Sequence, residues 1–166
     1  MRILFLTIFF PPSIGGVQSY SYDLVNNLCQ LGEDIVVVAS NGDGADKVDA
    51  SLPCQVFRVP AQPGYRELAM LLQAIQLVRR QHFDQIFCSD WMPAGLIAWM
   101  ITRFTRIPYF VAAHGSELLD DYNARYPLKA FLFKGFKLFR RRIFKSAETI
   151  FACLLYTSPS PRDRTR

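Results

Sequence analysis

Short runs of apolar residues alternate along the chain with longer segments in which apolar residues recur every three or four positions. The runs are continuous, which is typical of strands buried on both faces of a parallel sheet. They predict strands at residues 2–9, 34–39, 55–59, 83–88, 108–113 and 149–152. The helical spacing predicts helices at residues 17–31, 65–81, 93–104 and 128–145.

This alternation predicts an α/β fold, a doubly wound parallel sheet of Rossmann-like type, formed by residues 1–152. The polar segment "SNGDGADK", residues 40–47, is expected to be a loop. In the helix at 65–81, we expect one apolar face to pack on the sheet. That face holds Leu68, Leu71, Leu72, Ile75 and Val78.

A glycine pair follows the first strand, in the sequence "PPSIGG". Ligands of such folds bind where the strands end, and Gly15 and Gly16 stand there, just before a helix. Without a Cβ, their backbone N–H groups can approach a ligand closely, and the helix dipole favours an anion. The pair therefore predicts a diphosphate cradle. The alternative is a plain tight turn, since neither common nucleotide-binding spacing is present.

Polar residues also follow the fourth and fifth strands, in "SDWMP" and "HGSEL". His114 is expected on the same edge as the glycine pair, where it could donate a hydrogen bond to a hydroxyl or phosphate; the alternative is a buried histidine bonded to a backbone carbonyl. Ser116 could cap the next helix, with Glu117 in its first turn. Asp90 is either a polar contact for an acceptor or a helix cap.

Composition narrows the class of protein. The chain has 166 residues, a formal net charge of +5 and four cysteines, none in a C-x-x-C pair. A zinc site is therefore not expected, and free thiols indicate a reducing, cytoplasmic location. The apolar run at residues 3–10 lacks the charge and cleavage pattern of a signal peptide.

The helix predicted at 128–145 reads "LKAFLFKGFKLFRRRIFK", with lysines and arginines between phenylalanines and no acid. Such a helix can lie on an anionic membrane surface, which would make the protein peripheral on the inner face of the membrane. The alternative is an ordinary covering helix with solvated cations, and the two are compatible. Nucleic acid is not an expected partner, because no recognition motif accompanies the charge.

Taken in order, "PPSIGG", "LCQLGEDIVVVAS" and "HGSEL" resemble the N-terminal domain of family 4 glycosyltransferases over residues 1–152. Those enzymes are retaining, use a nucleotide-sugar donor and have the GT-B fold, of which this chain would be one half. The resemblance implies that Gly15 and Gly16 lie beside the donor diphosphate and that His114 contacts the donor sugar. The edge would bind a glycan, lipid-linked or small-molecule acceptor, with Asp90, Ser116 and Glu117 among the substrate-binding residues.

The resemblance further implies no cofactor other than the nucleotide-sugar donor and no metal, and the chain has no D-x-D motif. In this family a C-terminal domain supplies most nucleotide contacts, so this chain alone is expected to be inactive. Two alternatives stay open. One is a flavodoxin-like or receiver-type binding domain, and the other is a non-catalytic partner subunit.

The final segment, "CLLYTSPSPRDRTR", shows no strand or helix pattern. Its residues 153–163 resemble the translation of a transposon adapter used to build sequencing libraries. We therefore expect residues 153–166 to be a non-native tail that cuts the first domain short after Ala152. The alternative is a natural tail rich in serine, proline and arginine.

Overall fold

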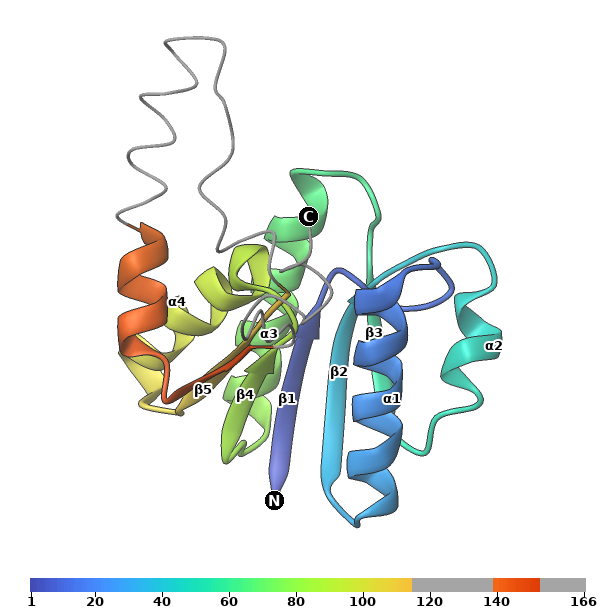
Figure 1. The fold of residues 1–166 in the computed structure, drawn as a ribbon, viewed down its shortest axis with the longest axis horizontal. Coiled ribbons are helices and arrows are strands. Elements are labelled where there is room, and N and C mark those ends of the chain that lie inside the picture. Colours follow the sequence, from blue (N-terminus) through green and yellow to red (C-terminus); the bar gives the residue numbers. More distant parts are fainter. Residues whose placement is uncertain (115–138, 153–166) are drawn as a thin grey trace, which may run out of the picture.

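The computed structural model describes residues 1–114 and 139–152, which form a six-stranded parallel sheet covered by helices on both faces (Figure 1). The strands are β1 (Arg2–Thr7), β2 (Asp34–Ser40), β3 (Gln55–Val59), β4 (Gln85–Cys88), β5 (Tyr109–Ala113) and β6 (Thr149–Ala152). The helices are α1 (Gly16–Gln30), α2 (Ala45–Asp49), α3 (Tyr65–Arg80) and α4 (Leu96–Thr105), with an irregular turn η1 (Trp91–Gly95) and a helical segment at residues 139–146. The predicted fold class is confirmed.

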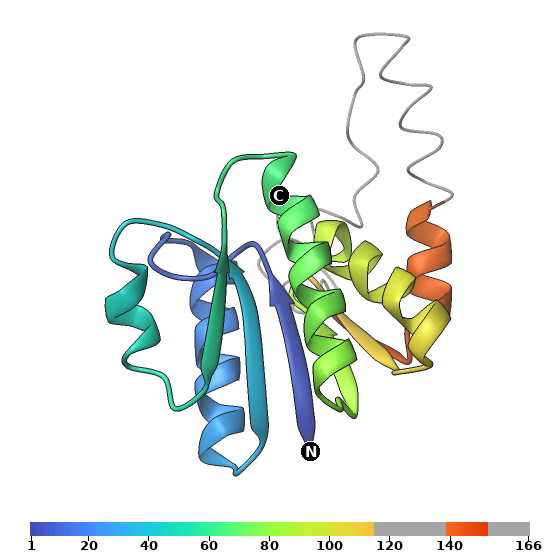
Figure 2. The same cartoon turned by 180° about the vertical axis from the view of Figure 1, so that it is seen from behind.

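Both faces of the sheet are apolar, because successive side chains of a strand point to opposite sides. Leu4 and Leu6 of β1 pack in a core with α3, α4 and Ile143 of the segment at 139–146. Ile3 and Phe5 pack on the other face, in a core that includes Val25 of α1. Figures 1 and 2 show α1 on one face of the sheet and α3 on the other. The continuous apolar runs follow from this double burial.

The strand order is β3-β2-β1-β4-β5-β6. From β1 the chain moves toward one side of the sheet, and from β4 it moves toward the other. The connections therefore diverge between β1 and β4, where Leu6 lies opposite Cys88. In doubly wound sheets, the crevice beyond the strand ends at such a point is where ligands bind. We call the side where the strands end the C-terminal edge and the opposite side the N-terminal edge.

Two local expectations were wrong. Residues 45–49, within and just beyond the expected loop, form α2, a single turn held by the burial of Ala45 and by an ion pair between Asp49 and Arg58. Tertiary contacts thus outweigh its polar sequence.

The second, the apolar face of α3, was wrong only in part, because Leu71, Ile75 and Val78 pack against the core as expected. Its buried residues are Met70, Ala74 and Leu77, whereas Leu68 and Leu72 are 55% and 58% exposed. Leucines occur on more than one side of this helix, so spacing alone did not identify the buried side.

Candidate functional site

A pair of buried hydroxyls joins the C-terminal ends of β1 and β4. The Ser89 hydroxyl donates to Thr7 Oγ1 at 2.6 Å, and the Ser89 backbone N–H donates to the Leu6 carbonyl at 3.1 Å. Thr7 Oγ1 also accepts from the Phe9 N–H at 3.0 Å, which ends the strand and turns the chain outward. These bonds fix the two strand ends relative to each other. Sequence reasoning missed both hydroxyls, although each directly ends or follows an apolar run.

Asp90 serves as a helix cap. Its carboxylate accepts from the Ala94 N–H at 3.1 Å and is hydrogen-bonded by the Ser89 hydroxyl at 3.3 Å. Asp90 is only 1% exposed, and its side chain acts as the helix cap that the sequence offered as one of two interpretations. Contact between Asp90 and an acceptor stays a prediction. The side chain fixes the start of η1 beside the end of β4.

The glycine pair lies at the start of α1. Gly15 is the N-cap with an extended backbone, and the first turn of α1 has neither a side-chain cap nor an acidic residue among the described positions. The first N–H groups of a helix have no partner within the helix. Here they and the positive end of the helix dipole point out of the C-terminal edge, an arrangement that favours an anion.

The two glycines differ in the space around them. A Cβ on Gly15 would lie 2.3 Å from the Gln18 side-chain oxygen, whereas within the described part of the chain nothing lies within 4 Å of a Cβ on Gly16. Neither residue has a φ in the left-handed region, and Gly15, with a φ of 165°, is extended. A strained turn therefore does not explain these glycines. Gly16 leaves open space beside the N–H groups of α1, where a ligand could approach.

His114 follows β5 and lies on the same edge. Its Nε2 is 2.8 Å from the Ser89 carbonyl, and its ring meets the ring of Tyr20 edge-on, with 5.2 Å between centroids. A carbonyl only accepts, so Nε2 carries the proton and Nδ1 of the neutral ring is an acceptor. The predicted carbonyl bond is thus present, in a side chain that is only partly buried. Because Tyr20 belongs to α1, the contact links His114 to the helix that begins at the glycine pair.

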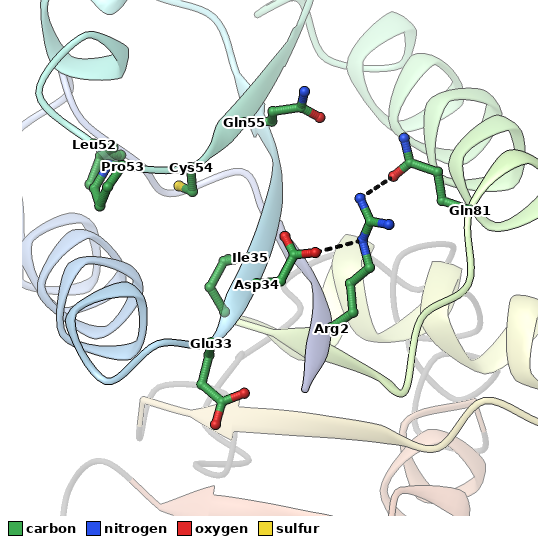
Figure 3. Close-up of a pocket in the computed structure, with 9 residues that line it drawn as sticks. All are labelled: Arg2, Glu33, Asp34, Ile35, Leu52, Pro53, Cys54, Gln55 and Gln81. Atoms are coloured by element: carbon green, nitrogen blue, oxygen red, sulfur yellow. Dashed lines mark hydrogen bonds and ion pairs between the residues drawn. The ribbon is translucent and has the colours of Figure 1, made fainter.

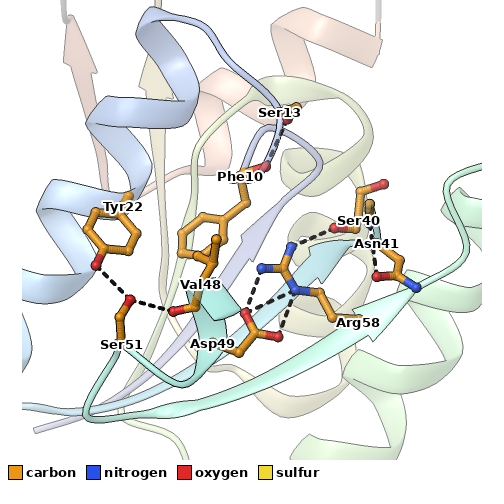
Figure 4. A network of polar contacts seen from close by, with 10 residues as sticks. Phe10, Ser13, Tyr22, Ser40, Asn41, Val48, Asp49, Ser51 and Arg58 are labelled. Atoms are coloured by element: carbon orange, nitrogen blue, oxygen red, sulfur yellow. Dashed lines mark hydrogen bonds and ion pairs between the residues drawn. The ribbon is translucent and has the colours of Figure 1, made fainter. Parts of the chain in front are cut away.

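A partly buried ion pair supports the loop before the glycines (Figure 4). Arg58 of β3 donates to both carboxylate oxygens of Asp49, the shortest contact being 2.6 Å, and to the Ser40 carbonyl at 2.7 Å. Its guanidinium carbon lies 5.4 Å from the centroid of the Phe10 ring, which itself contacts Tyr22 of α1. The charged pair therefore holds Phe10, and with it the segment leading to Gly15.

Two other predicted site residues, Ser116 and Glu117, lie outside the described residues. In the described ranges, 1–114 and 139–152, no cluster of three or more metal-binding side chains occurs. In the same ranges, no helix is long and apolar enough to cross a membrane.

A hollow with a volume of about 500 Å³ lies at the N-terminal edge (Figure 3). It is lined by the starts of β1, β2 and β3 and by the end of α3. Arg2 crosses it, 3.1 Å from Asp34 as an ion pair and 3.1 Å from Gln81 as a hydrogen-bond donor. The charged groups that line this hollow thus face one another.

Comparisons with known proteins identify the family of this chain. The family model described as a glycosyl transferase 4-like domain matches residues 15–157. A GDP-mannose-dependent monoacylated alpha-(1-6)-phosphatidylinositol monomannoside mannosyltransferase of Corynebacterium glutamicum is 29% identical over 119 residues. That alignment covers 70% of this chain and 31% of the mannosyltransferase, so the chain spans less than a third of the relative's length.

Among solved structures, the crystal structure of MurG from Acinetobacter baumannii has the same fold, with a TM-score of 0.57 at 12% identity. The match covers 96% of this chain and 43% of MurG. At that identity the likeness concerns the fold, one half of a GT-B architecture. The family match leaves no support for a flavodoxin-like or receiver-type domain. This chain belongs to the glycosyl transferase 4-like domain family.

Proposed function

We propose that this chain is the N-terminal, acceptor-side domain of a retaining glycosyltransferase that uses a nucleotide-sugar donor. The observation that carries the proposal is the start of α1, where uncapped N–H groups and the open space at Gly16 lie on the same edge as His114. Family membership supports sugar transfer as the chemistry.

The chemistry requires charge stabilisation at this position. The bond between the sugar's anomeric carbon and the diphosphate oxygen breaks, and a bond to an acceptor hydroxyl oxygen forms on the same face. The departing diphosphate gains negative charge as the bond breaks. Fixed N–H donors and the dipole of α1 act where that charge develops, and they need no rearrangement to do so.

His114 lies on the same edge in this scheme. Its bond to the Ser89 carbonyl and its ring contact with Tyr20 fix the ring beside the start of α1. We therefore propose that His114 contacts the donor sugar.

A second domain completes the proposed enzyme. The chain spans 31% of the mannosyltransferase and 43% of MurG, and in GT-B enzymes the site lies between two domains. This chain would supply one wall of that site. We expect no sugar transfer by the 166-residue chain and only weak binding of nucleotide sugars.

We also propose a lipid-linked acceptor at an anionic membrane surface. The name of the corynebacterial relative describes a phosphatidylinositol-based substrate for that protein. In this chain, α4 and the segment at 139–146 carry exposed aromatic residues beside cations: Phe104 is 89% exposed, and Arg103, Arg106 and Arg141 are exposed. Ile143 of the same segment is fully buried, and its carbonyl accepts from the Tyr109 hydroxyl. The covering and membrane roles can therefore coexist.

The function is tested by titrating the ¹⁵N-labelled chain with GDP-mannose, a UDP-sugar and mannose. Amide resonances of Gly16 and Val17 should shift with the nucleotide sugars and not with mannose, because the diphosphate is the group recognised. Shifts confined to the N-terminal edge would contradict the proposal. Turnover is then measured on the gene product that includes the second domain.

The membrane surface is tested by measuring binding to phosphatidylglycerol vesicles. Binding should weaken as salt is added and should be lost in Phe104→Ser.

A further inference from the structure

The side chain of Gln18 folds back over the glycine pair. Gln18 lies in the first turn of α1, three residues after the N-cap Gly15, and is partly buried. The three heavy atoms nearest to a Cβ built on Gly15 all belong to its amide, with Oε1 the nearest and Cδ and Nε2 at 3.0 and 3.3 Å. The amide therefore occupies the space that a larger residue at position 15 would need.

This amide explains why residue 15 is a glycine. The φ of Gly15, 165°, is extended backbone that any residue can adopt, so its conformation does not require glycine. A Cβ there would instead meet the end of the Gln18 side chain. Because that end can rotate, alanine at position 15 would displace the amide and leave the fold intact. Gly15 thus makes room for Gln18.

The turn before α1 needs such a contact. A glycine N-cap has no side chain to accept a hydrogen bond from the first N–H groups of the helix, and its backbone has more freedom than that of any other residue. Ser13 and Ile14, just before it, are exposed. The first hydrogen bond of α1 runs from the Ser19 N–H to the Gly15 carbonyl, at 3.0 Å. A side chain lying over Gly15 restricts the residue on which that bond depends.

Gly16 shows the opposite arrangement. Within the described part of the chain, a Cβ at Gly16 would meet nothing within 4 Å. The turn is therefore closed on the side of Gly15 and open on the side of Gly16. A ligand can approach the N–H groups of α1 from the open side, while the closed side holds the backbone that carries them.

We propose that Gln18 is a positioning residue, which holds the glycine turn so that the first N–H groups of α1 face the donor diphosphate. It acts through Gly15 and need not touch the ligand. The inference rests on the proposed function for the identity of the ligand, but not for the contact between Gln18 and Gly15. It separates the roles of the two glycines, because Gly15 accommodates Gln18 and only Gly16 gives access to the diphosphate.

A double-mutant cycle in the two-domain gene product tests this coupling. Gly15→Ala should weaken binding of a nucleotide sugar about threefold in the parent, and much less in a Gln18→Ala background, where the amide is already absent. Gly16→Ala is the matched control. Because Gly16 acts on the ligand directly, its effect should be the same in both backgrounds. Calorimetric titration with GDP-mannose, or with a UDP-sugar where the parent prefers it, measures each affinity.

Amide exchange tests the contact without any ligand. In the ¹⁵N-labelled 166-residue chain, the Ser19 N–H should exchange with water several times faster in Gln18→Ala and in Gly15→Ala than in the parent. Gln18→Glu, which has the same length and a flat end group, should keep the parent's protection. The amide of Val37, which is fully buried in β2, should be unchanged in every variant and reports on global opening.

The outcomes separate this inference from the proposed function. Equal effects of Gly15→Ala in the two backgrounds would overturn the inference, as would a Ser19 exchange rate that Gln18→Ala leaves unchanged. If no nucleotide sugar binds the parent, or if Gly16→Ala leaves binding unchanged, the diphosphate cradle fails, and the exchange rates alone decide whether Gln18 holds the turn. Circular dichroism confirms that each variant is folded, and Gln18→Ser replaces Gln18→Ala if it is not.

Discussion

The two edges of the sheet both carry charged side chains, but they use them differently. In the hollow at the N-terminal edge the charges face one another: the Met1 amine is 2.7 Å from Glu33, and Arg2 bridges Asp34 and Gln81. At the C-terminal edge the partly buried pair of Asp49 and Arg58 supports the loop that leads to the glycine pair. The first backbone N–H groups of α1 point outward at that edge.

This difference shows why a polar hollow is not by itself a binding site. A ligand at the N-terminal edge would have to displace protein–protein ion pairs, so each gained contact costs an existing one. A ligand at the C-terminal edge meets donors that the helix geometry leaves without intrahelical partners. The predictions below test that contrast by changing matched residues at the two edges.

The largest effect is expected from Arg58→Met. The side chains of Arg58 and Asp49 are 10% and 22% exposed, and removing the cation leaves a carboxylate in a largely buried position. We expect a loss of about 3 kcal/mol in the free energy of unfolding. The matched change at the other edge, Arg2→Met, should cost less than about 1 kcal/mol, because Arg2 and Asp34 are 36% and 59% exposed.

Urea denaturation of the two variants measures this difference. The double variant Arg58→Met/Asp49→Leu should recover part of the loss, because it removes both charges. Equal effects at the two edges would mean that the Arg58 pair does not support the C-terminal edge as argued.

His114→Ala should lower the turnover of the two-domain enzyme at least tenfold, equivalent to about 1.4 kcal/mol of transition-state stabilisation. The melting temperature should change little, since His114 is partly exposed and its role depends on the bound donor. His82→Ala is the control: this histidine is 85% exposed at the N-terminal edge, 3.7 Å from Asp84. A large fall in melting temperature with a normal rate would instead assign His114 a structural role.

Gly16→Ala should weaken donor binding in the two-domain enzyme by about threefold or more, roughly 0.7 kcal/mol, without loss of stability. Within the described chain a Cβ at Gly16 meets nothing, so only a ligand would feel it. The control variant is Gly32→Ala, near the N-terminal edge. Gly32 has a φ of +87°, so alanine should cost about 1 kcal/mol of stability and leave donor affinity unchanged. Calorimetric titration and thermal melting separate the two outcomes.

The sequence predicted the elements whose apolar pattern follows directly from burial. All six strands appear at their expected places, because burial on both faces demands continuous apolar runs. The glycine pair and His114 were placed on one edge by the same logic, since parallel strands end on one side. Their positions directly after strands were enough for this placement, and the chemistry of their side chains was not needed.

What the sequence did not predict depends on contacts between distant residues. The bond between Thr7 and Ser89 joins residues 82 positions apart, and α2 forms around a salt bridge to β3. Exposure of Leu68 and Leu72 depends on which side of α3 meets the sheet. The Tyr20–His114 contact likewise appears only once α1 and β5 are placed together.

The smallest expected effect concerns the ion pair of the Met1 amine at the N-terminal edge. The hydrogen-bonded carboxylate of Glu33 raises the pKa of this amine above its ordinary value of 8.0. A cation whose pKa is raised by folding contributes stability that is fully present below about pH 8. That contribution is lost as pH rises through the folded-state pKa.

We therefore expect the stability difference between the native chain and Glu33→Gln to shrink as pH increases above 8. Comparing the two chains cancels the contribution of the thiols, which ionise in this range once the chain unfolds. Melting curves between pH 7 and pH 10, on protein with an unmodified amino terminus, measure the difference. A constant difference across that range would show that the Met1–Glu33 contact adds nothing to the N-terminal edge, and the self-matching of its charges would then rest on Arg2 alone.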